Sequence, residues 1–209
     1  MKAYRIVLGF MSEIRATKPP ASISLAKTHL EAMRGRILEV LRAKKHEASE
    51  EELEKEIKKW WESTLNVFPR KQFNGGMQIA FPNTWIMGVL EERASALKLS
   101  KINRKVIKNG LMVRPRLIGL RRKGKPITEA EIIEDTVVSN DKFGKRSAIK
   151  HFEAVKPPAY TEAIYINIYT PLIDDESLRK LLEYGRLGAS RGQGCGEFKL
   201  LKFEEAETR

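Results

Sequence analysis

Short apolar stretches, one of them with clear alternation of hydrophobic and polar residues, predict the strands of this chain. The stretch at 4–12 (YRIVLGFMS) is apolar and rich in strand-forming residues, which predicts a buried strand. Residues 162–169 (EAIYINIY) alternate with a period of two, as expected for a strand with one buried face. The remaining predicted strands lie at 77–81, 111–120, 132–138, 148–155 and 198–203.

Apolar residues at helical spacing predict two helices early in the chain. The first covers 25–46, after a break at Lys18-Pro19-Pro20. The second begins at Ser49, where Glu52 three residues later completes a capping box. Together these segments predict a helical insertion at 25–65, directly after the first strand.

Two further helices are predicted from their end signals. Asn83 is the expected N-cap of a helix that continues to about Leu97. Ser177 is the expected cap of a short helix that ends before Gly185.

The order of these elements predicts the fold class. Strand, helix, strand followed by strand, helix, strand fits an α+β protein with a ferredoxin-like or RRM-like antiparallel sheet. The length of 209 residues fits a single domain, 1–209, that contains the helical insertion at 25–65. A glycine-rich loop near the C-terminus leads into the last strand.

Positive charge is concentrated in one part of the sequence. The chain has 39 Lys and Arg residues against 27 Asp and Glu, a net charge of +12, which indicates a polyanionic partner such as nucleic acid or an anionic membrane. Residues 98–125 hold eleven basic residues and no acidic one, whereas 47–62 holds seven Glu and three Lys. We expect 98–125 to form a binding face, because a merely solvated surface normally intersperses both signs.

The sequence does not predict membrane association. No run approaches the roughly 20 apolar residues that a membrane span needs, and no charged and apolar leader is expected. The basic stretch is predicted as strand and turn, and the amphipathic helix at 49–61 has an acidic polar face, which disfavours binding to a membrane surface. The single cysteine, Cys195, cannot form an intramolecular disulfide, so we expect a reducing cytoplasm.

Residues 185–196 (GRLGASRGQGCG) form a loop with five glycines, typical of a backbone that bends tightly or approaches another group closely. Its amides can converge on phosphate oxygens, to which Ser190 adds a hydroxyl and Arg191 a guanidinium. A glycine-rich hairpin without a ligand is the alternative. A dinucleotide-binding motif is excluded because the loop leads into a strand, and a P-loop at 119–126 is excluded because Pro126 occupies the required Ser/Thr position.

The sequence of the same loop resembles the signature of a known protein family. Its form, L-G-A-S-R-x-x-G-x-G-x-F before the last strand, is similar to the signature of the RAMP (repeat-associated mysterious protein) superfamily of CRISPR-associated proteins. Two other stretches resemble the backbone-subunit branch of that superfamily: 151–155 (HFEAV), which precedes Pro157-Pro158 and a strand, and 81–93 (FPNTWIMGVLEER). The matching loop residues are Leu187, Gly188, Ala189, Ser190, Arg191, Gly194, Gly196 and Phe198.

The resemblance implies an RRM-like fold, single-stranded CRISPR guide RNA as the ligand and a cytoplasmic location. It also implies assembly with other CRISPR-associated subunits, copies of this chain included. No cofactor is expected. We expect the RNA backbone to contact both the loop and the basic stretch. The candidate RNA-binding residues are Gly188, Ser190, Arg191, Gly192, Gln193, Gly194, Gly196, Arg114, Arg116, Arg121, Arg122, Lys123 and Lys125.

Catalytic residues are not evident. Target-cleaving subunits of the resembling family place an Asp in an early loop, but no Asp precedes Asp135 here. Guide-processing endoribonucleases of that family use His without a metal, and His29 is the candidate by position, with a packing histidine as the alternative. His46 is expected at a solvated helix end, and His151 in a structural or RNA-contacting role.

Other reactive side chains favour structural roles. The three histidines show no metal-ligand spacing, so no metal site is predicted. Cys195 has no histidine near it in the sequence and is expected to be a small buried residue and not a nucleophile.

Three hypotheses follow. The leading one is a non-catalytic RNA-binding subunit of a CRISPR-type ribonucleoprotein that holds guide RNA through its phosphate backbone. The second is a metal-independent endoribonuclease that processes CRISPR repeat RNA. The third is a scaffold or inhibitor of the same fold that engages proteins through Trp60, Trp61 and the acidic helix.

Overall fold

The computed structural model of the protein describes residues 2–17, 51, 55, 65–99, 101–141 and 144–207. The predicted helices at 25–46 and from Ser49 onward lie outside the described residues, apart from 51 and 55, so the helical insertion stays a prediction. The chain forms two compact units. One comprises Met1–Ala16, Phe68–Glu131 and Ala154–Arg209, and the other comprises Thr17–Val67 and Ile132–Glu153.

Among the residues that the structure describes, the first unit contains a ten-stranded sheet and three helices. Its strands are β1 (Lys2–Phe10), β4 (Arg70–Phe73), β5 (Gly76–Pro82), β6 (Leu111–Arg114), β7 (Leu117–Arg122), β8 (Lys125–Pro126), β11 (Ala159–Thr161), β12 (Ile164–Ile168), β13 (Tyr184–Arg186) and β14 (Glu197–Ala206). Its helices are α3 (Thr84–Ala96), α4 (Arg104–Gly110) and α5 (Asp175–Leu182), and a 3-10 turn covers Arg191–Gln193.

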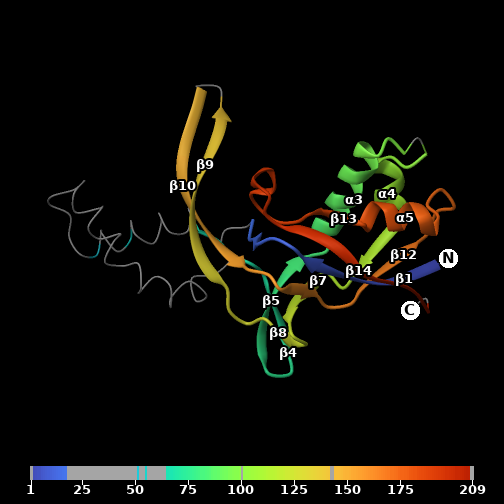
Figure 1. Ribbon diagram of the computed structural model, residues 1–209, viewed down its shortest axis with the longest axis horizontal. Coiled ribbons are helices and arrows are strands. Elements are labelled where there is room, and N and C mark those ends of the chain that lie inside the picture. The colour runs from blue at the N-terminus through green and yellow to red at the C-terminus, as the bar shows by residue number, and fades with distance from the viewer. Residues whose placement is uncertain are drawn as a thin grey trace. The chain divides into compact units, whose positions relative to one another are not determined.

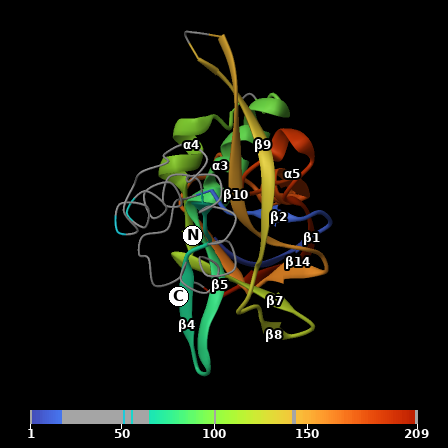
Figure 2. The same ribbon diagram turned by 90° about the vertical axis from the view of Figure 1, so that its left-hand side faces the viewer.

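Four of these strands define a ferredoxin-like sheet. They lie side by side in the order β14, β1, β12, β6, and every neighbouring pair is antiparallel. Along the chain, α3 and α4 lie between β1 and β6, and α5 lies between β12 and β14. This is the βαββαβ order with the strand arrangement 4-1-3-2, so the predicted α+β class with an antiparallel sheet is confirmed. Figures 1 and 2 show the three helices on the same side of β1 and β14.

The sheet divides into two branches beside β1. The first half of β1 pairs with β12, whereas Gly9 and Phe10 pair with β11. From β11 the second branch continues through β7 and β5 to β4. Residues 115–116 link the two branches between β6 and β7, and residues 162–163 link them between β11 and β12.

Alternation along β1 gives the sheet one apolar face and one polar face. Tyr4, Ile6 and Leu8 are buried in the core, while Arg5 and Val7 between them are half-buried on the other face. On β12, Ile164, Ile166 and Ile168 are buried in the same core. The apolar sides of α3 and α5 cover this face with the buried residues Ile86, Val89, Leu90, Ala94, Leu178, Leu181 and Leu182.

Three local predictions need correction. The basic stretch is not only strand and turn, because it contains α4, whose N-cap Asn103 accepts hydrogen bonds from two backbone amides through its side chain. The strand predicted at 111–120 is two strands, β6 and β7, interrupted at Pro115. The cap of α5 is Asp174 and not Ser177: the Asp174 carboxylate accepts a hydrogen bond from the Ser177 amide at 2.7 Å.

The second unit is built around two long strands, β9 (Glu131–Asp141) and β10 (Gly144–Val155), which pair with each other. Strand β10 also pairs in parallel with the short β3 (Leu65–Asn66). The last two residues of β10 belong to the first unit, where they pair with β2 (Ile14–Arg15).

Candidate nucleic-acid interface

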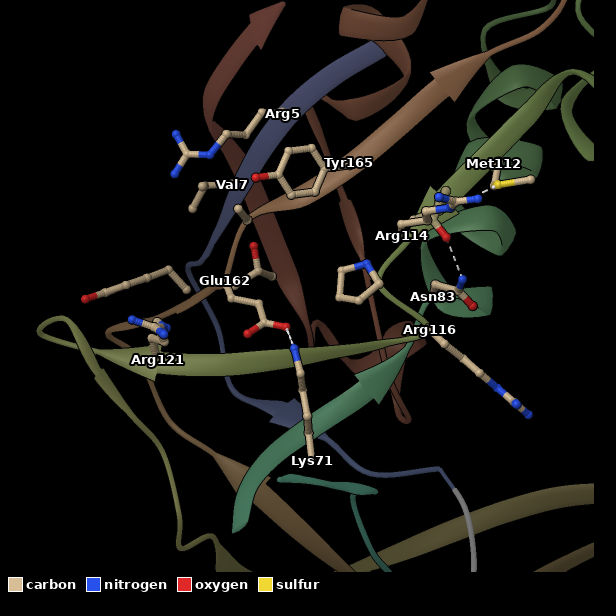
Figure 3. Close-up of a pocket in the computed structure, with 15 residues that line it drawn as sticks. Arg5, Val7, Lys71, Asn83, Met112, Arg114, Arg116, Arg121, Glu162 and Tyr165 are labelled. Carbon is tan, nitrogen blue, oxygen red and sulfur yellow. Dashed lines mark hydrogen bonds and ion pairs between the residues drawn. The ribbon is translucent and has the colours of Figure 1, made fainter. Parts of the chain in front are cut away.

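A cleft of about 1170 Å³ opens in the first unit where the two branches of the sheet separate. Arg5 and Val7 line it from β1, so it lies on the face of the sheet opposite the core and helices. The remaining lining residues come from β4, the start of α3, β6, β7 and the segment from β11 to β12, and Figure 3 shows how they surround the cleft. They are Lys71, Asn83, Met112, Val113, Arg114, Pro115, Arg116, Arg121, Tyr160, Thr161, Glu162, Ala163 and Tyr165.

The side chains of the cleft carry an excess of positive charge. Five basic residues line it, namely Arg5, Lys71, Arg114, Arg116 and Arg121, against a single carboxylate, Glu162. Lys71 forms an ion pair with Glu162, and in Figure 3 its side chain points directly at that carboxylate. Arg5 pairs with Glu204 of β14 at 3.2 Å.

The other three arginines of the cleft have no carboxylate partner in the described part of the chain. The Arg114 Nε lies 3.2 Å from the Met112 sulfur, and an Arg121 Nη donates to the Gly124 carbonyl at 3.1 Å. Arg116 is exposed and in Figure 3 extends away from Glu162. These guanidinium groups therefore retain most of their hydrogen-bonding capacity for an anion.

Asn83 holds the segment that carries Arg114 and Arg116. Its side-chain amide donates to the Val113 carbonyl at 2.6 Å, and its backbone amide donates to the Arg116 carbonyl at 2.9 Å. Asn83 stands at the N-cap position of α3, as predicted, but its side chain makes no capping hydrogen bond. The sequence suggested only a helix start here, because the partner strand lies thirty residues away along the chain.

Glu162, which lines the cleft, accepts a further hydrogen bond besides its ion pair with Lys71. The Gln78 amide donates to Glu162 at 3.3 Å, opposite the Lys71 ion pair. Gln78 crosses directly over Gly119, where an added Cβ would lie 1.9 Å from its amide nitrogen. Glycine at 119 is therefore required for this contact.

The predicted residues at 122–125 lie on a hairpin beside the cleft. Lys123 and Gly124 both have positive φ, 48° and 80°, and form the two-residue turn between β7 and β8. Arg122 donates to the carbonyls of Lys156 at 2.6 Å and Pro158 at 3.1 Å. Lys123 and Lys125 are exposed, and none of these three residues lines the cleft.

The basic run at 98–125 is divided between different surfaces. On α4, Arg104 forms an ion pair with Glu91 of α3 at 2.6 Å, and Lys108 lies 4.0 Å from the same carboxylate. These cations are therefore on the helical side of the sheet, whereas Arg114 and Arg121 are in the cleft. A stretch that is continuous in sequence does not form one continuous face.

The glycine-rich loop packs against residues 13–15 and closes on itself. An added Cβ at Gly188 would lie 2.4 Å from the Arg15 carbonyl oxygen, and one at Gly196 would lie 1.7 Å from the Leu187 carbonyl oxygen. Both glycines also have positive φ. Backbone amides of the loop donate hydrogen bonds to backbone carbonyls of the protein. The amides of Leu187, Ala189 and Gly196 donate to the carbonyls of Gly196, Arg15 and Glu13 respectively. The packing and the backbone conformation of the loop therefore require glycine at 188 and 196.

The polar side chains of the loop also have protein partners. The Ser190 hydroxyl accepts a hydrogen bond from Arg15 at 3.3 Å, and Arg191 pairs with Glu92 at 2.7 Å. Gly192 and Gln193 are exposed with Arg191 at the tip. None of the residues 185–196, all of which the structure describes, lines the cleft, so RNA contact by the loop stays a prediction.

Of the histidines, tryptophans and cysteine singled out in the sequence, the structure describes only Cys195 and His151. His29, His46, Trp60 and Trp61 lie outside the described residues. Cys195 is buried, as predicted. His151 is 2 % exposed, and burial lowers its pKa below the usual 6.5, although the charge of Glu134 opposes the shift. In the described ranges, no group of three or more His, Cys, Asp or Glu residues is placed to hold a metal ion.

Comparisons with known proteins give little further guidance. No protein-family model matches the chain, and no curated protein matches it. A solved structure entitled "Cryo-EM structure of the Type III-B Cmr-beta bound to cognate target RNA" contains a similar chain, with a TM-score of 0.49 and 12% identity. That match covers 98% of this chain and 60% of the other. Among the described helices, none is long and apolar enough to cross a membrane.

Substitution of Gly196 tests the structural role of the loop. We expect Gly196→Ala to lower the free energy of unfolding by at least ~2 kcal/mol, because its Cβ would overlap the Leu187 carbonyl at an unfavourable φ. Gly192→Ala is the matched control, since no atom lies within 4 Å of its added Cβ. Urea denaturation measures both, and equal stability of the two variants would contradict the packing described here.

Buried His151 predicts a pH dependence of stability. Because its pKa is lowered in the folded state, the unfolded chain binds more protons below about pH 6.5, and stability falls as the pH decreases from there. The contribution of this residue has a slope of at most ~1.4 kcal/mol per pH unit. Urea denaturation of the wild type and His151→Gln between pH 5 and 8 measures it. A wild-type slope that persists in His151→Gln would show that another group is responsible.

Proposed function

We propose that this chain binds single-stranded RNA by its phosphate backbone in the arginine-lined cleft. We further propose that it does so as a non-catalytic subunit of a CRISPR-type ribonucleoprotein. The observation that carries the RNA-binding proposal is the set of three cleft arginines without carboxylate partners in the described chain, Arg114, Arg116 and Arg121.

Electrostatics favours a phosphate ligand at this site. Guanidinium groups donate paired hydrogen bonds to phosphate oxygens, and several of them along a groove release counterions from a nucleic acid backbone. The two ion pairs of the cleft, Arg5 with Glu204 and Lys71 with Glu162, leave the sign of the charge positive. A neutral ligand would gain nothing from this excess.

The CRISPR context rests on the sequence resemblance. The loop from Leu187 to Phe198 is similar to the RAMP signature, and the ferredoxin-like order of strands is the fold that this resemblance implies. On this proposal the partners are guide RNA and other CRISPR-associated subunits, copies of this chain included, in the cytoplasm. The loop would add contacts through the exposed residues at its tip, Arg191, Gly192 and Gln193.

Neutralising the cleft arginines tests RNA binding. We expect Arg114→Gln/Arg116→Gln/Arg121→Gln to reduce affinity for a single-stranded RNA by about 10-fold or more at moderate salt. We also expect a decrease of about 2 in the slope of log affinity against log salt, since each phosphate contact contributes about 0.7. Fluorescence anisotropy with a labelled 20-nucleotide RNA in EDTA measures both, and recovery of intact RNA checks that the chain does not cleave it.

A second triple variant controls for net charge. Lys105→Gln/Arg179→Gln/Lys180→Gln removes the same charge from exposed positions on α4 and α5, remote from the cleft lining. We expect it to bind RNA with nearly wild-type affinity. If both variants lost affinity equally, binding would depend on overall charge and the proposed site would be wrong. Cleavage of the RNA in EDTA would instead favour the endoribonuclease hypothesis.

A further inference from the structure

A row of side chains crosses the polar face of the sheet in register. Tyr165 on β12 lies directly opposite Arg5 on β1 on one side and Arg114 on β6 on the other. All three line the cleft, and Figure 3 shows Tyr165 beside Arg5, with Arg114 across from it. An aromatic ring is thus placed between two arginine side chains.

The surroundings of Tyr165 are suited to a flat, partly apolar group. The ring is half-buried, and the apolar residues that line the same cleft include Val7, Met112 and Ala163. In the described part of the chain, no residue hydrogen-bonds to the Tyr165 hydroxyl. Tyr160, the other tyrosine of the cleft, is instead fixed to the hairpin, because its hydroxyl accepts a hydrogen bond from the Gly124 amide.

We propose that Tyr165 is a stacking platform for one nucleobase of a strand whose flanking phosphates are held by Arg114 and by the N–H groups of Arg5 that do not bond to Glu204. This inference rests on the proposed function. Neighbouring strands of a sheet lie about 4.8 Å apart, so Arg5 and Arg114, two strands from each other, are roughly 10 Å apart at the backbone. Their long side chains can reach the phosphates on either side of a single nucleotide. A nucleobase is a planar ring system with some polar edges, which matches the lining.

The proposal has a consequence for the class of RNA. A base paired in a duplex is stacked on its neighbours and cannot lie on a protein ring without leaving the helix. Stacking on Tyr165 therefore selects unpaired RNA, and it does so without reading the sequence, because every base has an aromatic face. Arginine contacts alone would not distinguish a single strand from a duplex in this way.

Three variants test whether the Tyr165 ring contributes to RNA affinity by stacking on a base. Tyr165→Ala removes the ring, Tyr165→Phe keeps the ring and removes only the hydroxyl, and Tyr169→Ala removes an exposed tyrosine that does not line the cleft. The probes are a labelled single-stranded RNA, a duplex of the same length and a single-stranded oligomer with the same backbone and no bases. Fluorescence anisotropy measures each affinity.

We expect Tyr165→Ala to reduce affinity for the single-stranded RNA by about 5- to 150-fold while leaving affinity for the baseless oligomer unchanged. Tyr165→Phe and Tyr169→Ala should bind as the wild type does. The inference is overturned if Tyr165→Ala binds the RNA normally, or if it loses affinity equally for the RNA and the baseless oligomer. If the wild type binds none of the three probes, the proposed function itself fails.

Discussion

The alternation of side chains along β1 is the constraint on which both faces of the sheet depend. This strand is bonded on both sides, to β14 and to β12 with β11, so its register is fixed by three neighbours. Tyr4, Ile6 and Leu8 point into the core, and Arg5 and Val7 therefore point into the cleft. A shift by one residue would bury Arg5 and expose the apolar set, at a cost that no local contact could offset.

The cleft follows from how the strands beyond β1 are connected. Because β12 and β11 pair with different halves of β1, the sheet opens between them, and the two short links across the opening carry Arg116 and Glu162. Asn83 fixes one link through two hydrogen bonds, and Gln78 contacts Glu162 by passing over Gly119. These hydrogen bonds fix the two links, and the positions of Arg116 and Glu162 therefore depend on the fold.

Local patterns predicted the elements of this fold better than they predicted its surfaces. An apolar run of strand-forming residues predicted β1, and period-two alternation predicted β12. End signals predicted α3 to within two residues but placed the cap of α5 at Ser177, three residues after Asp174. These signals succeed because they depend on neighbours in sequence. The branching of the sheet and the Asn83 bonds depend on residues far apart in the chain, and nothing local signals them. The basic run was predicted as one face, yet α4 within it carries its cations to the helical side, where Glu91 pairs with them. The glycine loop was predicted as a phosphate cradle from its composition, which could not show that Gly188 and Gly196 lie against the carbonyls of Arg15 and Leu187.

We therefore propose that RNA binds on the polar face of the sheet, between the branches, where Tyr165 lies between Arg5 and Arg114. The most direct test is photo-cross-linking of a single-stranded RNA that contains 4-thiouridine, followed by mass spectrometry of the cross-linked peptides. We expect cross-links in the segments that line the cleft, at 111–121 and 160–165. Cross-links confined to α3, α4 and α5 would contradict it, because those helices lie on the opposite side of the sheet.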